Sequence, residues 1–185
     1  HELCRRAGCG LLLDINNVEV SAFNLGCDPA PWLDAFDPAL VGEVHVAGHS
    51  RKDDCVGGTI AIDDHGSAVR QSCWDLLSAF LRRAGPRPVL VEWDSDVPDY
   101  LTLVAEVARA DAELARANLD RALQLVERGF ISKADVDRLT ATRDAARARV
   151  AVAQAQYNEL LARNARLDIV APAAGLVLER NVEPG

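Results

Sequence analysis

The sequence lacks methionine altogether, and its aromatic residues are few: three Trp, two Tyr and four Phe in 185 residues. It also lacks a long apolar run, and no run approaches the roughly 20 residues with which a helix crosses a bilayer. The first residues, HELCRRAGCG, contain neither an initiator methionine nor the apolar stretch of a signal peptide. We therefore expect an internal fragment of a longer protein, without a transmembrane segment.

Basic charge is scarce in the first part of the chain. Residues 1–110 carry 17 Asp and Glu against 9 Lys and Arg, whereas residues 111–185 carry 11 of each kind. The resulting net charge of −8 argues against a nucleic-acid partner, because backbone phosphates are bound by a basic face.

Cysteine, histidine and tryptophan are absent after residue 93. The five cysteines are odd in number and have no CxxC spacing, so they indicate neither a disulfide framework nor a zinc ribbon, and reduced thiols are expected. The later residues are rich in Ala and Arg with helical periodicity. The sequence thus indicates a chimera whose junction lies between Ala105 and Ala112, crossed by one continuous helix. We predict three parts, at residues 1–109, 110–167 and 168–185.

The first part contains four short apolar runs, each followed at once by polar residues, at positions 10–17, 42–49, 59–66 and 88–96. Such runs are typical of strands buried on both faces of a parallel sheet. Helices are predicted at residues 28–36 and 69–84; in the second, Trp74, Leu77 and Leu81 share one face and Gly85 marks the end. Alternating strands and helices predict a partial βα barrel.

Metal-competent side chains follow all four runs, and in a βα barrel the carboxyl ends of the strands converge on one mouth. The predicted metal ligands are Asp14, Asn17, His45, Asp63, His65 and Glu92. The plainer alternative is that a carboxylate such as Asp63 or Asp64 caps a helix and that Asn16 and Asn17 form a turn. If the groups share a metal, mixed imidazole and carboxylate ligands favour iron, manganese or zinc.

The strings LLLDINNVEVSAFN, EVHVAGHS, IDDHGSAV and LVEWDSDVP resemble the multinuclear non-haem iron-dependent oxidative enzymes, a TIM-barrel family that modifies cysteine-containing precursor peptides in natural-product biosynthesis. The resemblance covers residues 2–109. It implies two or three iron ions on the six ligands given above, with His49 and Asp94 as neighbours, and oxygen-dependent oxidation at a peptide cysteine in the cytoplasm.

That family also supplies His and Glu ligands from strands upstream of the first motif, and in this chain only nine residues precede GLLLD. We therefore expect half a barrel with open sheet edges, which binds metal weakly and is active only if the missing half is supplied.

The second part has the spacing of a coiled-coil seam, with apolar or neutral residues at positions 136, 139, 146, 150, 153, 157, 160 and 167 and polar ones at 143 and 164. An arm before it repeats the spacing at positions 112, 115, 119, 122 and 126. Gly129 is a helix terminator, and Ser132 with Asp135 forms a capping-box-like start. Two antiparallel helices of about 20 and 35 residues are predicted. A generic coiled coil without chemistry is the plain interpretation.

Two features of residues 111–185 resemble HlyD-type periplasmic adaptor (membrane-fusion) proteins. Arg121, Leu125 and Ser132 match the hairpin tip of that family, and RLDIVAPAAGLVLERNVEPG resembles half of its lipoyl-like β domain. The resemblance implies a periplasmic location, a tip that docks on an outer-membrane channel, and an inner-membrane transporter as partner.

Three hypotheses follow: a fragment of an iron-dependent peptide-modifying oxidase that is not fully active as it stands, a periplasmic adaptor subunit of an efflux or type I secretion system, or a composite in which neither half functions. We also expect the two pieces to fold and melt independently, because charge and periodicity change at one boundary.

Overall fold

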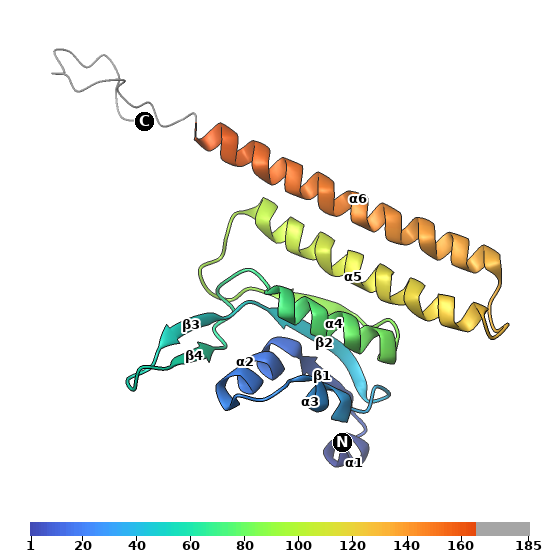
Figure 1. Ribbon diagram of the computed structural model, residues 1–185, viewed down its shortest axis with the longest axis horizontal. Helices are drawn as coiled ribbons and strands as arrows, with labels where there is room; N and C mark the ends of the chain where they lie inside the picture. The colour runs from blue at the N-terminus through green and yellow to red at the C-terminus, as the bar shows by residue number, and fades with distance from the viewer. Residues whose placement is uncertain (166–185) are drawn as a thin grey trace.

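The computed structural model describes residues 1–165. Figure 1 shows an α/β unit from which two long helices extend. The elements, in chain order, are α1 (Glu2–Ala7), β1 (Leu11–Asp14), α2 (Ile15–Leu25), α3 (Ala30–Ala35), β2 (Val41–Ala47), β3 (Ser50–Asp53), β4 (Thr59–Ile62), α4 (Gln71–Ala84), β5 (Val89–Glu92), α5 (Tyr100–Val126) and α6 (Lys133–Asn164). No helix among the described residues is long and apolar enough to span a membrane. The predicted β segment at 168–185 lies outside the described residues.

Three of the four predicted strands form one parallel sheet, in the order β1-β2-β5. β2 pairs with both neighbours, so β1 and β5 are its edges. Helices connect the strands, as βαβ units require. This mixed α/β arrangement with a parallel sheet is compatible with a partial TIM-barrel-like domain.

The prediction of a fourth parallel strand at residues 59–66 is wrong. The segment forms β4, which pairs antiparallel with β3 in a separate two-stranded sheet. Local contacts favour this hairpin: Asp54 closes the turn by accepting from the backbone N–H groups of Val56 and Gly58. On the other edge of β4, the side-chain amide of Asn24 pairs with the backbone of Ala61 at 2.8 and 2.9 Å. β4 thus has a partner on each side without joining the parallel sheet.

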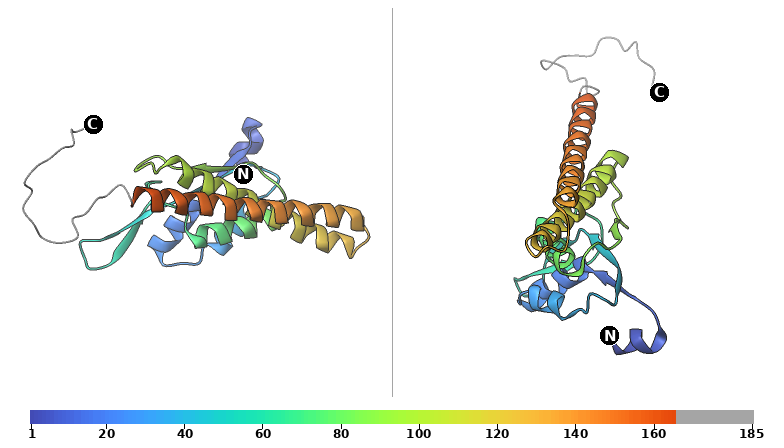
Figure 2. Two further views of the ribbon diagram at one scale, coloured as in Figure 1. Left: turned by 90° about the horizontal axis from the view of Figure 1, so that it is seen from above. Right: turned by 90° about the vertical axis from the view of Figure 1, so that its right-hand side faces the viewer.

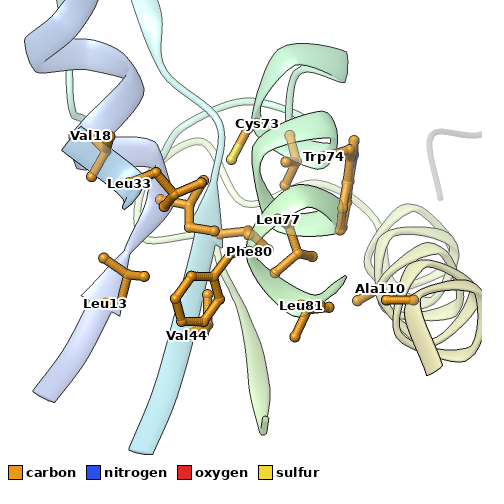
Figure 3. Close-up of a cluster of buried hydrophobic side chains, with 14 of the residues drawn as sticks. Leu13, Val18, Leu33, Val44, Cys73, Trp74, Leu77, Phe80, Leu81 and Ala110 are labelled. Carbon is orange, nitrogen blue, oxygen red and sulfur yellow. The ribbon is translucent and has the colours of Figure 1, made fainter. Parts of the chain in front are cut away.

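Helix α4 forms the centre of the hydrophobic core, and the predicted face of Trp74, Leu77 and Leu81 is fully buried. Figure 3 shows Phe80 and Cys73 on the side of α4 that faces the sheet, whereas Trp74 and Leu81 lie on the side that faces α5. The helix ends where Gly85 adopts a left-handed φ of 80°, as the sequence predicts.

Helices α5 and α6 lie side by side and run in opposite directions (Figures 1 and 2). They have 27 and 32 residues, so the first is longer than predicted. On α6 every predicted seam position up to residue 160 is partly or fully buried, and Ala146 and Ala153 are the most buried of them. Asn164 is exposed. The supercoiling of a coiled coil stays a prediction.

Helix α5 crosses the predicted junction without a break, as expected. Ala110 and Ala117 belong to the same buried cluster as Trp74 and Leu81, a contact that is unexpected for two parts that fold and melt independently. The guanidinium of Arg109 also lies over the Trp74 ring, 5.0 Å from its centroid. The first long helix therefore packs on the α/β unit as well as on α6.

Replacement of Ser132 by Ala is expected to lower the stability of the helix pair by about 1 kcal/mol, because Ser132 caps α6. Its hydroxyl accepts from the Asp135 backbone N–H at 3.1 Å and donates to the Asp135 carboxylate at 2.7 Å. Thermal unfolding followed by circular dichroism measures the loss. Ser132→Thr, whose hydroxyl can both accept from the backbone and donate to Asp135, is the matched control and is expected to retain most of the stability; equal losses in both variants would rule out the cap as the cause.

Candidate metal centre

The two faces of the parallel sheet differ in character. Because side chains alternate along a strand, the register assigns Leu13, Val44 and Val46 to the face that is buried in the core cluster. The opposite face carries the other set, which consists of Leu12, Asp14, Glu43, His45, Ala47, Leu90 and Glu92. Leu12 and Leu90 are 53% and 43% exposed, so helices do not cover this face in the described part of the chain. Predicted ligands from three strands therefore share one open surface.

His65 is at the centre of the site. It lies three residues beyond the end of β4 and has a positive φ of 46°, a conformation that L-residues adopt infrequently. One ring nitrogen, Nε2, is 3.0 Å from Asp63 Oδ1 and 3.7 Å from Asp14 Oδ2. The other, Nδ1, is 3.3 Å from Glu92 Oε2 and 3.2 Å from Asp94 Oδ2. Carboxylates from three segments thus surround one imidazole.

The carboxylates change the acid–base properties of the site. Burial by itself would lower the pKa of His65, but the charges of Asp63, Asp14, Glu92 and Asp94 outweigh it and raise that pKa above its ordinary value. Burial, together with the charge of Asp63, raises the pKa of Asp14, against the effect of a hydrogen bond from the Asn17 backbone. A bound cation would relieve the repulsion among carboxylates that are crowded around an imidazole in this way.

Three of the predicted ligands have the spacing of a metal site. Asp14, His65 and Glu92 each offer one donor atom, and these atoms lie within 4.8 Å of one another. The buried Nδ1 of His65 makes no hydrogen bond with residues 1–165, although carboxylate oxygens are close to it. A donor that is free of hydrogen bonds and surrounded by oxygens fits a transition-metal ion with mixed nitrogen and oxygen ligands.

The remaining predicted ligands lie around this triad. His45 is on the central strand, with Nδ1 3.1 Å from Glu92 Oε2 and Nε2 3.8 Å from Glu43 Oε1. Asn17 is exposed, and its amide nitrogen donates to Asp63 Oδ2 at 3.0 Å. Asp94, expected as a neighbour, is near His65 but has a largely exposed side chain. The structure thus brings all six predicted residues to one place; their roles as ligands stay predictions.

The alternative interpretation of the strand ends holds only for Asp14. Its Oδ1 accepts from the Asn17 backbone N–H at 2.9 Å, so Asp14 is the N-cap of α2 as well as a neighbour of His65. Asp63 and Asp64 do not cap α4, whose N-cap is Arg70. Asn16 and Asn17 lie in the first turn of α2 and not in a loop.

Sequence reasoning missed Asn16. It selected Asn17, yet Asn16 is fully buried and its side-chain amide donates to Asp63 as well. The sequence does not indicate which of two adjacent asparagines is buried. That depends on the helical phase of α2, which turns residue 16 inward. His49 was expected as a neighbour of the metal but is not part of the donor group: it is fully buried and contacts Asn16.

The predicted channel-docking residues Arg121, Leu125 and Ser132 make the following contacts in the described part of the chain, and their docking role stays a prediction. The guanidinium of Arg121 lies against Gly85 at the end of α4, so closely that a Cβ on Gly85 would collide with it. The side chain of Ser132 is used in the cap of α6. Leu125 is half-buried between the helices.

Comparison with known proteins identifies relatives of the first part of the chain. The profile of the family described as "RiPP precursor modification enzyme MbnB/TglH/ChrH" matches residues 1–115. A UPF0276 protein of Caulobacter vibrioides is 47% identical over 119 residues, which cover 64% of this chain and 42% of the relative. A UPF0276 protein of Chromobacterium violaceum is 44% identical over 117 residues, or 63% of this chain and 41% of the relative.

A third relative, the UPF0276 protein RB0508 of Rhizobium meliloti, is 44% identical over 119 residues, which cover 64% of this chain and 37% of that protein. The chain therefore spans about two fifths of the length of these relatives. The family match continues to residue 115, beyond the predicted junction, and the adaptor resemblance of residues 111–185 is left as a prediction. By its sequence over residues 1–115, the chain belongs to the MbnB/TglH/ChrH family of RiPP precursor modification enzymes.

Proposed function

We propose that the α/β unit holds the metal site of an iron-dependent oxidative enzyme that modifies cysteine-containing precursor peptides. The observation that carries the proposal is the donor group of Asp14, His65 and Glu92 on the open face of the sheet. Family membership supports the substrate class, a ribosomally made precursor peptide.

Iron, when bound, supplies the activation of dioxygen that oxidation of a peptide cysteine requires. The residues of this chain hold and orient it. Asp14 and Glu92 provide negative oxygen donors from the ends of β1 and β5, and His65 provides a nitrogen donor between them. Asp63 accepts hydrogen bonds from the amides of Asn16 and Asn17 and is 3.0 Å from His65 Nε2, which fixes the imidazole.

The open face also offers a place for the peptide. Leu12 and Leu90 are exposed on the same face as the donor group, nearer the amino ends of their strands. An apolar side chain of the peptide packed there would bring an adjoining cysteine toward Glu92 and His45. The three donors fill only part of an iron coordination sphere, so the described residues are expected to bind the ion weakly.

We do not extend the proposal to the adaptor function. Of its three predicted tip residues, Arg121 lies against α4 and Ser132 caps α6. This leaves Leu125 as the one tip side chain without such a structural role.

Titration of the full chain with Fe²⁺ in the absence of oxygen tests the metal site. The wild type is expected to bind, and His65→Ala and Glu92→Gln are each expected to weaken binding by about tenfold or more, because the first removes a donor and the second removes the negative charge of one. Asp53→Asn, an exposed acid at the end of β3, is the matched control and is expected to bind as the wild type does. Equal binding by all four proteins, or no binding by the wild type at millimolar iron, would contradict the proposal.

A further inference from the structure

We propose that Asn16 and His49 are positioning residues, which form a buried chain of hydrogen bonds that holds Asp63 against His65. Both side chains are fully buried, and neither belongs to the donor group. The inference rests on the proposed metal site for its functional meaning, but the hydrogen-bond chain is a property of the protein without metal.

The first link is the amide of Asn16. Its Nδ2 donates to Asp63 Oδ1 and to the carbonyl oxygen of Gly48, the latter at 3.4 Å. Both partners can only accept, since an ionised carboxylate and a carbonyl carry no proton. The nitrogen of the amide must therefore face Asp63, and its oxygen, Oδ1, must face the other way.

The second link is the imidazole of His49. Its Nδ1 lies 3.0 Å from Asn16 Oδ1. Because that oxygen can only accept, Nδ1 must carry the proton, and the neutral ring then has a bare Nε2. This Nε2 is buried and has no hydrogen-bond partner in the described part of the chain. Burial lowers the pKa of His49, although the charge of Glu19 opposes the effect, so the ring remains neutral.

The chain ends at the metal centre. Asp63 is held by Asn16 on Oδ1 and by Asn17 on Oδ2, and its Oδ1 is 3.0 Å from His65 Nε2. The backbone N–H groups of Asp94 and Ser95 donate to the His65 carbonyl oxygen at 2.9 and 3.4 Å, but these bonds do not fix the side-chain torsions of the ring. We infer that loss of the His49 donor would free the Asn16 amide to turn, release Asp63, and let the His65 ring move away from Glu92.

Binding of Co²⁺ to the full chain tests this inference. His49→Leu removes the donor, whereas His49→Asn places an amide N–H where Nδ1 stood and removes Nε2. Affinity is expected to fall about tenfold to a hundredfold in His49→Leu and in Asn16→Leu, and to return to within about threefold of the wild type in His49→Asn. The visible absorption spectrum of bound Co²⁺ is expected to change in His49→Leu and to recover in His49→Asn.

Ser78→Ala removes a buried hydroxyl on α4, away from Asn16 and His49. It is the control for general destabilisation and is expected to leave the affinity unchanged. Two outcomes would overturn the inference. If His49→Asn binds as poorly as His49→Leu, Nε2 is itself a ligand; if His49→Leu binds as the wild type does, His49 has no positioning role.

A measurement without metal separates this inference from the proposed function. Nitrogen-15 spectra of the histidine rings in the metal-free wild type are expected to show the Nδ1–H tautomer for His49, and an Nε2–H tautomer would overturn the chain of hydrogen bonds. The His65 ring signals are expected to shift in His49→Leu and to return in His49→Asn. If they do so while the wild type binds no Co²⁺, the positioning chain stands and the proposed metal site fails; if they stay unchanged in His49→Leu, the positioning role fails.

Discussion

Replacement of Ala117 by Asp is expected to destabilise the entire chain by about 3 kcal/mol or more, because it buries a carboxylate without a partner. Ala117 is fully buried in the cluster that includes Trp74 and Leu81, although it lies on α5, beyond the residue at which the sequence predicts a junction. A charge at this position has to be accommodated by the contact between α4 and α5. We expect that contact to open, so that the α/β unit and the helix pair lose stability together.

Ala145→Asp is the matched control, because Ala145 is exposed on α6 and the substitution carries the same loss of helix propensity. It is expected to change the free energy of unfolding by no more than about 0.5 kcal/mol beyond that propensity cost. Urea unfolding followed by far-UV and near-UV circular dichroism measures both variants. A single transition at the same urea concentration in both signals is the expected result; an early loss of helix signal in Ala117→Asp, with the near-UV signal unchanged, would show that the two parts fold independently.

Sequence patterns correctly predicted the helices in which the apolar spacing and the residues that begin or end the helix indicate the same element. In α4, the spacing of Trp74, Leu77 and Leu81 defines the buried face and Gly85 ends the helix. Ser132 begins α6 in the same way. These features depend on residues close together in the sequence, so periodicity and capping are sufficient to predict them.

Elements that depend on distant partners were predicted less well. The apolar run of β4 has the composition of a buried parallel strand, but its neighbours are β3, made by the adjacent hairpin, and the Asn24 side chain, which is 37 residues away from Ala61. The docking of α5 on α4 likewise relies on small residues such as Ala110 and Ala117. Periodicity cannot show whether such residues face α4 or belong to a seam that faces α6 alone.

The candidate site shows the same division. The strand-end pattern predicted that Asp14, His65 and Glu92 meet, because parallel strands bring their carboxyl ends to one edge. It did not predict that the segment carrying His65 arrives from a separate antiparallel hairpin. Nor did it separate Asn16 from Asn17, since the difference lies in which of them the first turn of α2 points inward.

The metal-free chain is expected to lose stability as the pH rises above 6.5, because the pKa of His65 is raised in the folded protein. The four carboxylates raise the pKa of His65 in the folded protein above the 6.5 of the unfolded chain. The protonated ring therefore stabilises the fold fully below the unfolded value, and this contribution is lost as the pH rises through the higher, folded value. Thermal unfolding at several pH values measures the trend, and it is expected to be absent in His65→Gln, which keeps a polar side chain without a titrating group.

Binding of Co²⁺ is expected to have the opposite dependence on pH, because the metal needs the neutral imidazole and must displace its proton. Below the pKa of His65, each unit of pH is expected to weaken binding by about tenfold, which makes this one of the largest effects expected for the site. Titration with Co²⁺ at about pH 6, 7 and 8 measures it. An affinity that stays constant over this range would mean that the ion does not bind at His65. A weaker affinity at higher pH would also contradict the site, because loss of the ring proton removes a positive charge and cannot oppose the binding of a cation. The expected result, a rise in affinity with pH that mirrors the fall in stability, requires that metal and proton compete for the same nitrogen donor between Asp14 and Glu92.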